Sequence, residues 1–143
     1  MKGPSNKEMS HDQMKMTNEP HHVLAMAYRQ NLAAFAKVLQ QQTAGAASVN
    51  IEFARAAVTE MRRSFDQMKQ HHQEHMGTMS AEMHTKMSGM MKQMEAHQTE
   101  LNTQLMALEQ EVQLSTPDAK KVATLAASVN SHIAAMSKLK HKK

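Results

Sequence analysis

The segment that decides the fold is ARAAVTEMRRSFDQMKQHHQEHMGTM, residues 54–79. Apolar side chains and histidines recur in it at alternating steps of four and three residues, the spacing that keeps side chains on one stripe of a helix. The stripe consists of Ala54, Val58, Met61, Phe65, Met68, His72, His75 and Met79. This pattern predicts a long helix over residues 48–76, with one face buried against other helices and Gly77 as its stop.

Three further helices are expected, over residues 20–43, 80–114 and 117–139. Pro20, Ser80 and Thr116 mark where they begin, because proline is tolerated in a first turn and hydroxyl side chains cap helices. The residues predicted to be buried are Leu24, Tyr28, Phe35, Val38 and Leu39 in the first; Met83, Met87, Met90, Met94, His97, Leu101, Leu105, Leu108 and Val112 in the third; and Val122, Ala126, Val129, Ile133 and Met136 in the fourth.

The composition also favours an all-α protein. Good helix formers dominate. Aromatic residues, which β-sheets favour, are scarce, with three Phe, one Tyr and no Trp among the 143 residues. Because the connections are short, consecutive helices should be antiparallel, and we expect an up-down-up-down four-helix bundle. Residues 1–18 have no apolar periodicity and are predicted to form a flexible tail that carries Met9, His11, Met14 and Met16.

Met and His are unusually frequent, at sixteen and ten residues, and there is no Cys. In the expected bundle they gather at the end that holds the turn between the second and third helices, whereas residues 40–50 and 110–120, at the other end, contain neither. Equal rise along antiparallel helices predicts the neighbours at this end. These are His21 and His22 with His71, His72 with Met83, Met68 with Met87, and Met94 and His97 with His132 and Met136.

Thioether and imidazole side chains together point to copper. Thioethers bind Cu(I) and Ag(I) well and hard ions poorly, while imidazole also suits Cu(II), Zn(II) and Ni(II). The predicted metal-binding residues are Met68, His71, His72, His75, Met76, Met79, Met83, His84, Met87, Met90, Met91, Met94, His97, His21, His22, Met26, His132 and Met136. Packing is an equally good interpretation of Met61, Met94, Met106 and Met136, and a core role is the simpler one for His97.

Other chemistries have less support, and we expect no catalytic residues and no enzyme. Glu8 with His11 is a Glu-x-x-His pair that lies in the tail, so the two such pairs on facing helices that a ferritin-like di-iron site needs are not expected, and HHQEH is not the zinc-protease motif. The absence of Cys excludes disulfides and thiolate sites, and the absence of a long apolar run excludes a predicted transmembrane helix. The net charge of +4 and the basic KLKHKK, residues 138–143, leave binding to nucleic acid or an anionic surface as a minor alternative.

Two motifs, HHVLAMA at 21–27 and HHQEHM at 71–76, lie within the Met-rich span 9–97. In these features the chain resembles bacterial periplasmic metal-resistance proteins that are helical and rich in Met and His. The resemblance implies binding or sequestration of copper or silver in the cell envelope. Residues 1–20 lack the apolar part of a secretory signal, so the chain is either cytosolic or a periplasmic or secreted protein whose signal was removed.

The leading hypothesis is therefore a soluble copper-binding protein for storage, sequestration or delivery, with Cu(I) as its main ion, Cu(II) at the histidines and silver as a substitute. Its expected partners are metal ions and a metal exporter or metallochaperone. The alternative is a helical periplasmic chaperone or metal-regulated adaptor, because Met-rich surfaces also serve promiscuous recognition.

Overall fold

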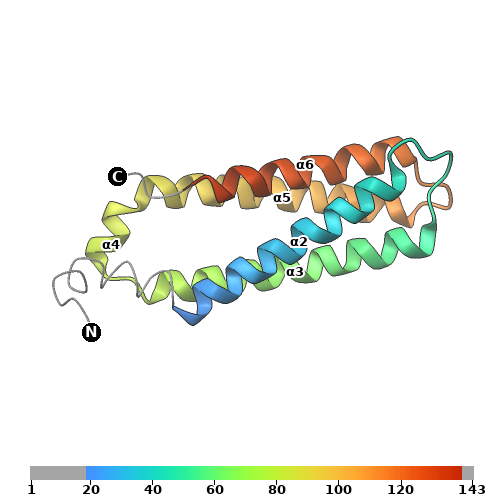
Figure 1. The fold of residues 1–143 in the computed structure, drawn as a ribbon. Helices are drawn as coiled ribbons and strands as arrows, with labels where there is room; N and C mark the ends of the chain where they lie inside the picture. The colour runs from blue at the N-terminus through green and yellow to red at the C-terminus, as the bar shows by residue number, and fades with distance from the viewer. Residues whose placement is uncertain (1–18, 140–143) are drawn as a thin grey trace, which may run out of the picture.

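The computed structural model describes residues 19–139, and this part of the chain is entirely helical, which confirms the all-α class (Figure 1). The helices are α2 (Pro20–Thr43), α3 (Ile51–Gly77), α4 (Ala81–Lys86), α5 (Ser88–Gln113) and α6 (Ala119–Ser137). The predicted tail, residues 1–18, and the last part of the basic stretch, residues 140–143, lie outside the described residues. Within residues 19–139, no helix is long and apolar enough to cross a membrane.

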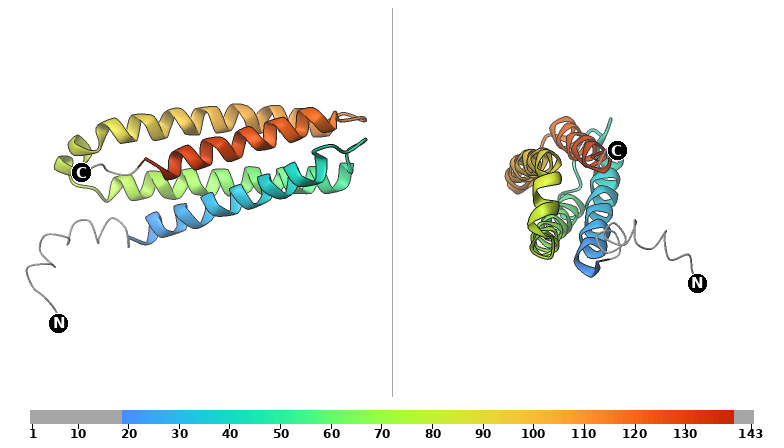
Figure 2. Two further views of the ribbon diagram at one scale, coloured as in Figure 1. Left: turned by 45° about the horizontal axis from the view of Figure 1, so that its top comes forward. Right: turned by 90° about the vertical axis from the view of Figure 1, so that its left-hand side faces the viewer.

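The four long helices surround a shared core. α2 packs against α3 and α6, and α5 packs against α6 and α3, so that each long helix has two neighbours (Figure 2). The α2–α3 pair and the α5–α6 pair lie closer together at the end with the loops 44–50 and 114–118 than at the end with α4 (Figure 1). We call these the loop end and the α4 end. α4 crosses the α4 end from α3 to α5.

The core changes composition along the molecule. Toward the loop end it is built from fully buried Leu and Val, and toward the α4 end Met takes their place. The buried Leu and Val residues are Leu32, Leu39, Val58, Leu101, Leu105, Leu108, Val112, Val122 and Val129. Burial of each such side chain stabilises the fold by about 1.5–3 kcal/mol. The half of the molecule toward the loop end therefore supplies most of the apolar stabilisation, and the half toward the α4 end contributes less of it.

Two predicted helix starts agree with the structure. The carboxylate of Glu19 caps α2 by accepting a hydrogen bond from the backbone N–H of His22 at 3.0 Å, with Pro20 in the first turn. The hydroxyl of Ser80 caps α4 by accepting from the N–H of Met83 at 3.1 Å. α3 ends at Gly77, as expected.

Two other predicted starts were wrong. α3 begins at Ile51 rather than Ser48, because the Asn50 side chain accepts a hydrogen bond from the N–H of Phe53 and caps the helix. α6 begins at Ala119 rather than residue 117, with Asp118 as its cap in place of Thr116. Asn and Asp are better N-caps than Thr, and in each case the nearest strong cap to the helix sets its first residue.

The single helix predicted over residues 80–114 is interrupted. α4 stops at Lys86 and α5 begins at Ser88, because Met87 between them leaves the helical conformation, with φ −98° and ψ 6°. The next two residues are Ser88 and Gly89, and glycine in particular is a poor helix former. The break allows α4 to turn across the end of the molecule instead of continuing along α5 (Figure 1).

The predicted buried stripes are confirmed for most of α3, α5 and α6 and only in part for α2, where Leu39 is buried and Tyr28 and Phe35 pack partly buried against the core. Leu24 and Val38 are exposed, and the buried positions of α2 are Ala25, Leu32, Ala36, Leu39 and Thr43. Small alanine side chains let α2 approach its neighbours closely, so a search for large apolar residues misses them. Met106, for which packing was as good an interpretation as metal binding, is 47% exposed.

Candidate metal-binding sites

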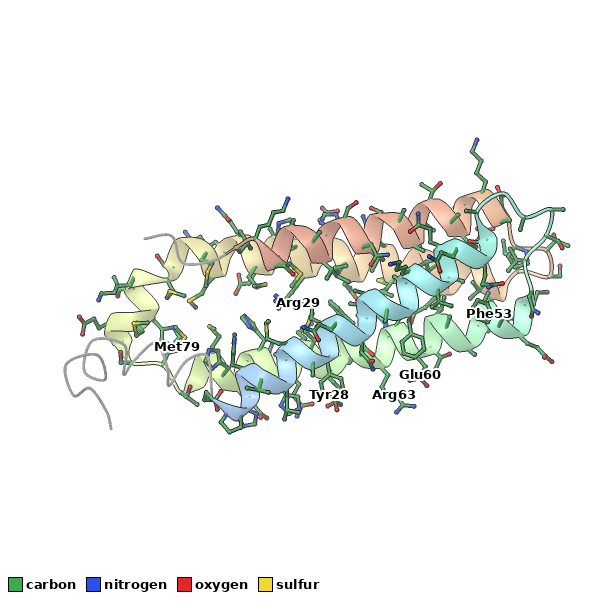
Figure 3. All side chains as sticks on the ribbon, in the orientation of Figure 1. Tyr28, Arg29, Phe53, Glu60, Arg63 and Met79 are labelled. Atoms are coloured by element: carbon green, nitrogen blue, oxygen red, sulfur yellow. The ribbon has the colours of Figure 1, made fainter. Side chains whose placement is uncertain are left out.

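A cavity of about 290 Å³ lies among α2, α3, α5 and α6 at the α4 end. Seven Met and three His line it, namely Met26, Met68, Met76, Met87, Met90, Met94 and Met136 with His22, His72 and His75. The rest of its wall is Ala25, Arg29, Gln98, Ser137 and Leu139. Figure 3 shows the sulfur atoms concentrated in the half of the molecule that carries α4. Ten of the eighteen predicted ligands therefore meet around one space.

Helical periodicity directs these side chains inward. On α3, Met68, His72 and His75 continue the stripe that buries Phe65 nearer the loop end. Met87, directly before α5, is followed on α5 by Met90 and Met94, at steps of three and four. The wall is completed by Met26, in the first part of α2, and Met136, in the last turn of α6.

His75 is held in a fixed orientation by Glu19. Its ring is 3% exposed, and its Nδ1 lies 2.8 Å from Oε1 of Glu19. Burial tends to raise the pKa of Glu19, but the hydrogen bonds from the His75 side chain and from the backbone N–H groups of His22 and His21 outweigh it and lower the pKa. Nδ1–H therefore donates to a carboxylate, which leaves the lone pair of Nε2 free for a metal ion.

His72 and His22 favour the neutral form. Burial lowers the pKa of His72 to about 4, and the nearby basic side chains of His75, His22 and Arg29 contribute to the shift. Burial also lowers the pKa of His22, with smaller contributions from His75 and Arg29 that exceed the opposing effect of Glu19. Neutral imidazole is the form that binds metals, so near pH 7 these side chains need not release a proton first.

The guanidinium of Arg29 makes the cavity better suited to a bound ion of low positive charge. Its Nη2 donates to the sulfur of Met26 at 2.8 Å, and burial lowers its pKa. Among residues 19–139, no Asp or Glu lines the cavity. Because the repulsion between a guanidinium and a bound ion scales with the charge of the ion, a monovalent ion is disfavoured less than a divalent one.

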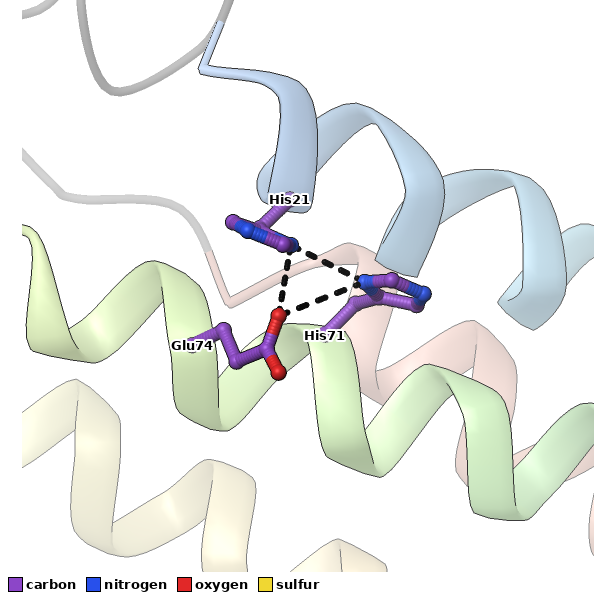
Figure 4. Close-up of side chains that lie close together, drawn as sticks. All are labelled: His21, His71 and Glu74. Carbon is purple, nitrogen blue, oxygen red and sulfur yellow. Dashed lines mark hydrogen bonds and ion pairs between the residues drawn. The ribbon is translucent and has the colours of Figure 1, made fainter.

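A second group of donors lies outside the cavity (Figure 4). Nδ1 of His21 lies 3.0 Å from Nδ1 of His71 and 2.9 Å from Oε1 of Glu74, and Nδ1 of His71 lies 3.9 Å from the same oxygen. The ring of Tyr28 is stacked on that of His71, with centroids 5.8 Å apart and planes at 3°. The structure thus separates His71 from His72 and His75, with which it was grouped in sequence.

The other predicted residues lie in smaller groups. Nδ1 of His97 is 3.0 Å from Nδ1 of His132 across α5 and α6, as the register predicts. Nε2 of His84 is 2.8 Å from the backbone oxygen of Met76, a contact between α4 and the last turn of α3. Half-buried residues that do not line the cavity are Met79, Met83 and Met91. The expected pairing of His72 with Met83 does not form around the cavity, because α4 turns away at the break.

Sequence reasoning missed Glu19, Arg29 and Glu74. Each has a readable signal, since Glu74 follows His71 by three residues and Arg29 follows Met26 by three, which places each pair on one helix face. Glu19 directly precedes the first residue of α2, where a capping carboxylate is favoured. The search for ligands by softness passed over these charged residues.

No known protein family, curated protein or solved structure matches this chain. The chemistry of the two donor groups is therefore the basis for the function proposed below.

Proposed function

We propose that this protein binds Cu(I), and Ag(I) in its place, within the Met-lined cavity, for storage, sequestration or delivery of the metal. The observation that carries the proposal is the convergence of seven thioethers and three imidazoles on one cavity of about 290 Å³. Thioether sulfur is a soft ligand that selects soft monovalent ions over Mg(II), Ca(II) or Zn(II).

The proposed scaffold is an antiparallel, up-down-up-down four-helix bundle. Hydrogen bonds between α3 and α5 support this antiparallel order, because residues with higher numbers on α3 contact residues with lower numbers on α5. The guanidinium of Arg55 donates to the backbone oxygen of Val112, and that of Arg62 donates to both carboxylate oxygens of Glu109. Such a scaffold builds metal sites from side chains on facing helices.

The charges of the side chains that line the cavity favour a monovalent ion over a divalent one. The thioethers are uncharged, and the low pKa values of His72 and His22 keep these rings neutral near pH 7. Arg29 already contributes one positive charge, which the nearby carboxylate of Glu19 partly offsets through His75. The ten donors exceed the coordination shell of one ion, so the cavity should hold more than one equivalent of metal.

Location and partners are part of the proposal. The resemblance to periplasmic metal-resistance proteins supports a place in the bacterial cell envelope, where the protein would exchange metal with an exporter or a metallochaperone. A chaperone or adaptor without a metal store is the competing function. It predicts that the cavity binds apolar ligands and leaves copper in solution.

A competition titration tests the proposal. Metal-free protein is titrated under reducing, oxygen-free conditions against a chromophoric Cu(I) chelator, and Ag(I) loading is counted by native mass spectrometry. We expect the protein to withdraw more than one equivalent of Cu(I) from the chelator. Retention of all Cu(I) by the chelator, with only the metal-free mass observed, would contradict the proposal.

Matched variants locate the binding. One variant carries Met68→Leu, Met87→Leu and Met90→Leu in the cavity, and its control carries Met79→Leu, Met83→Leu and Met91→Leu outside it. Leu fills the volume of Met with little loss of packing, so both variants should keep their helicity. We expect the cavity variant to lose at least about tenfold in Cu(I) affinity and the control to stay near wild type. Equal loss in both would show that the cavity is not the site.

A further inference from the structure

We propose that His21, His71 and Glu74 form a second metal site, separate from the Met-lined cavity, for a divalent ion of borderline softness such as Zn(II), Cu(II) or Ni(II). The three side chains come from the first turn of α2 and from α3 near the α4 end. Each offers one donor atom, and the three atoms lie within 4.8 Å of one another.

The distances between the donors fit one ion. They are 2.9 Å from His21 Nδ1 to Glu74 Oε1, 3.0 Å between the two Nδ1 atoms, and 3.9 Å from His71 Nδ1 to Glu74 Oε1. The point equidistant from the corners of such a triangle lies about 2.0 Å from each, which matches the metal–nitrogen and metal–oxygen bonds of Zn(II), about 2.0–2.2 Å. A small displacement from this plane leaves a fourth position open for water or an exchanging ligand.

The donors are held in place before any ion arrives. The ring of Tyr28 is stacked on that of His71, with centroids 5.8 Å apart, and the ring of His21 meets His71 through its Nδ1 atom, with centroids 5.2 Å apart. The side chain of His71 is 15% exposed, whereas those of His21 and Glu74 are 37% and 44% exposed (Figure 4). An ion can therefore reach the group from solvent, while the most constrained ligand stays fixed.

The two nitrogens are close enough to share one metal ion in place of a proton. Two Nδ1 atoms at 3.0 Å repel through their lone pairs unless a proton lies between them, and a metal ion satisfies both lone pairs at once. The carboxylate of Glu74 cancels one unit of the ionic charge. Two imidazoles with a carboxylate form a ligand set that suits Zn(II), Cu(II) and Ni(II) and gives no advantage to Cu(I).

This inference does not depend on the proposed function. None of His21, His71 and Glu74 lines the Met cavity, so the cavity could fail to bind copper while this site binds a divalent ion. An ion here would also tie α2 to α3, and a ligand that binds only the folded state raises the temperature of unfolding.

The test is a Zn(II) titration of the metal-free, full-length protein against a chromophoric chelator, with the unfolding temperature followed in parallel. We expect one tight equivalent and a rise in Tm of several degrees. His71→Gln and Glu74→Gln should each lower Zn(II) affinity by at least about tenfold. The control His84→Gln removes a half-buried imidazole of the same end and should change the affinity less than twofold.

Two further variants keep the outcomes distinct. Because a substitution at His71 could disturb packing, the more exposed His21→Gln is measured as well, and helicity is checked by circular dichroism. The cavity variant Met68→Leu, Met87→Leu and Met90→Leu should retain full Zn(II) affinity and lose Cu(I) affinity. The proposal is overturned if wild type binds none of Zn(II), Cu(II) and Ni(II), or if His21→Gln and Glu74→Gln both bind Zn(II) as wild type does.

Discussion

Three histidines within five residues of α3 have three different environments. His71 meets His21, Glu74 and the ring of Tyr28. His72 faces the Met-lined cavity, where burial keeps it neutral, and His75 is fixed there by the carboxylate of Glu19. Each step along a helix rotates the side chain by about 100°, so adjacent residues contact different neighbours. The surroundings of each imidazole ring, rather than the number of rings, therefore determine which metal ion that ring is suited to bind.

At the residue scale, the environment of His72 predicts how stability depends on pH. Its pKa is about 4 in the folded protein and 6.5 when unperturbed, so between these values the unfolded chain binds more protons. Stability of the metal-free protein should therefore fall as pH drops from 6.5 to 4, by on the order of 3 kcal/mol from this group, and should lose no more from it below pH 4.

The variant His72→Gln should lack this part of the loss. Urea unfolding at pH 7, 5.5 and 4 measures it, and His84→Gln, which removes an imidazole outside the cavity, is measured beside it. If His72→Gln and wild type lose the same stability across this window, the ring is not held neutral by burial.

At the scale of elements, the break between α4 and α5 shapes the α4 end. α3 and α5 are farther apart there than at the loop end, and α4 crosses between them (Figure 1). A continuous helix through residues 80–114 would instead extend along α5 and leave the end of the cavity without this crossing segment. Ser88 and Gly89, the two residues after the break, are weaker helix formers than alanine.

Two glycines provide a matched test of backbone conformation. A Cβ at Gly89 or at Gly45 would meet no atom within 4 Å, but Gly45 has φ +73° whereas Gly89 lies in a helix. Gly89→Ala should stabilise the protein by about 0.5–1 kcal/mol, because alanine favours the helix. Gly45→Ala should destabilise it by about 1–2 kcal/mol, because the left-handed conformation strains a side chain. Urea midpoints that shift in the same direction would contradict this account.

The elements differ in how far sequence predicts them. The stripes of α3, α5 and α6 were readable because large apolar residues mark them, whereas α2 buries Ala25 and Ala36, which periodicity alone does not distinguish from exposed alanines. Counting residues from the turns predicted the His21–His71 and His97–His132 contacts. It could not predict the position of Met83, since α4, which carries it, crosses the end of the molecule instead of running back along α3 (Figure 1).

At the scale of the whole molecule, the Leu and Val core and the two proposed metal sites lie toward opposite ends. The loop end combines the Leu and Val core with the ion pair of Arg62 and Glu109 and with Glu111, whose carboxylate accepts from the N–H of Asp118. The α4 end holds the Met-lined cavity and the group of His21, His71 and Glu74. Ligands at one end can thus be exchanged while the apolar core at the other keeps the helices together.

If the thioethers of the cavity bind soft monovalent metal, as proposed, X-ray absorption at the copper edge will find sulfur around the ion. Protein loaded with one equivalent of Cu(I) under reducing conditions should show a first shell dominated by sulfur, with at most a minor nitrogen component from the three cavity histidines. The Met68→Leu, Met87→Leu and Met90→Leu variant should lose much of the sulfur signal. A first shell of nitrogen and oxygen alone in the wild-type protein would contradict the claim and assign the methionines to packing.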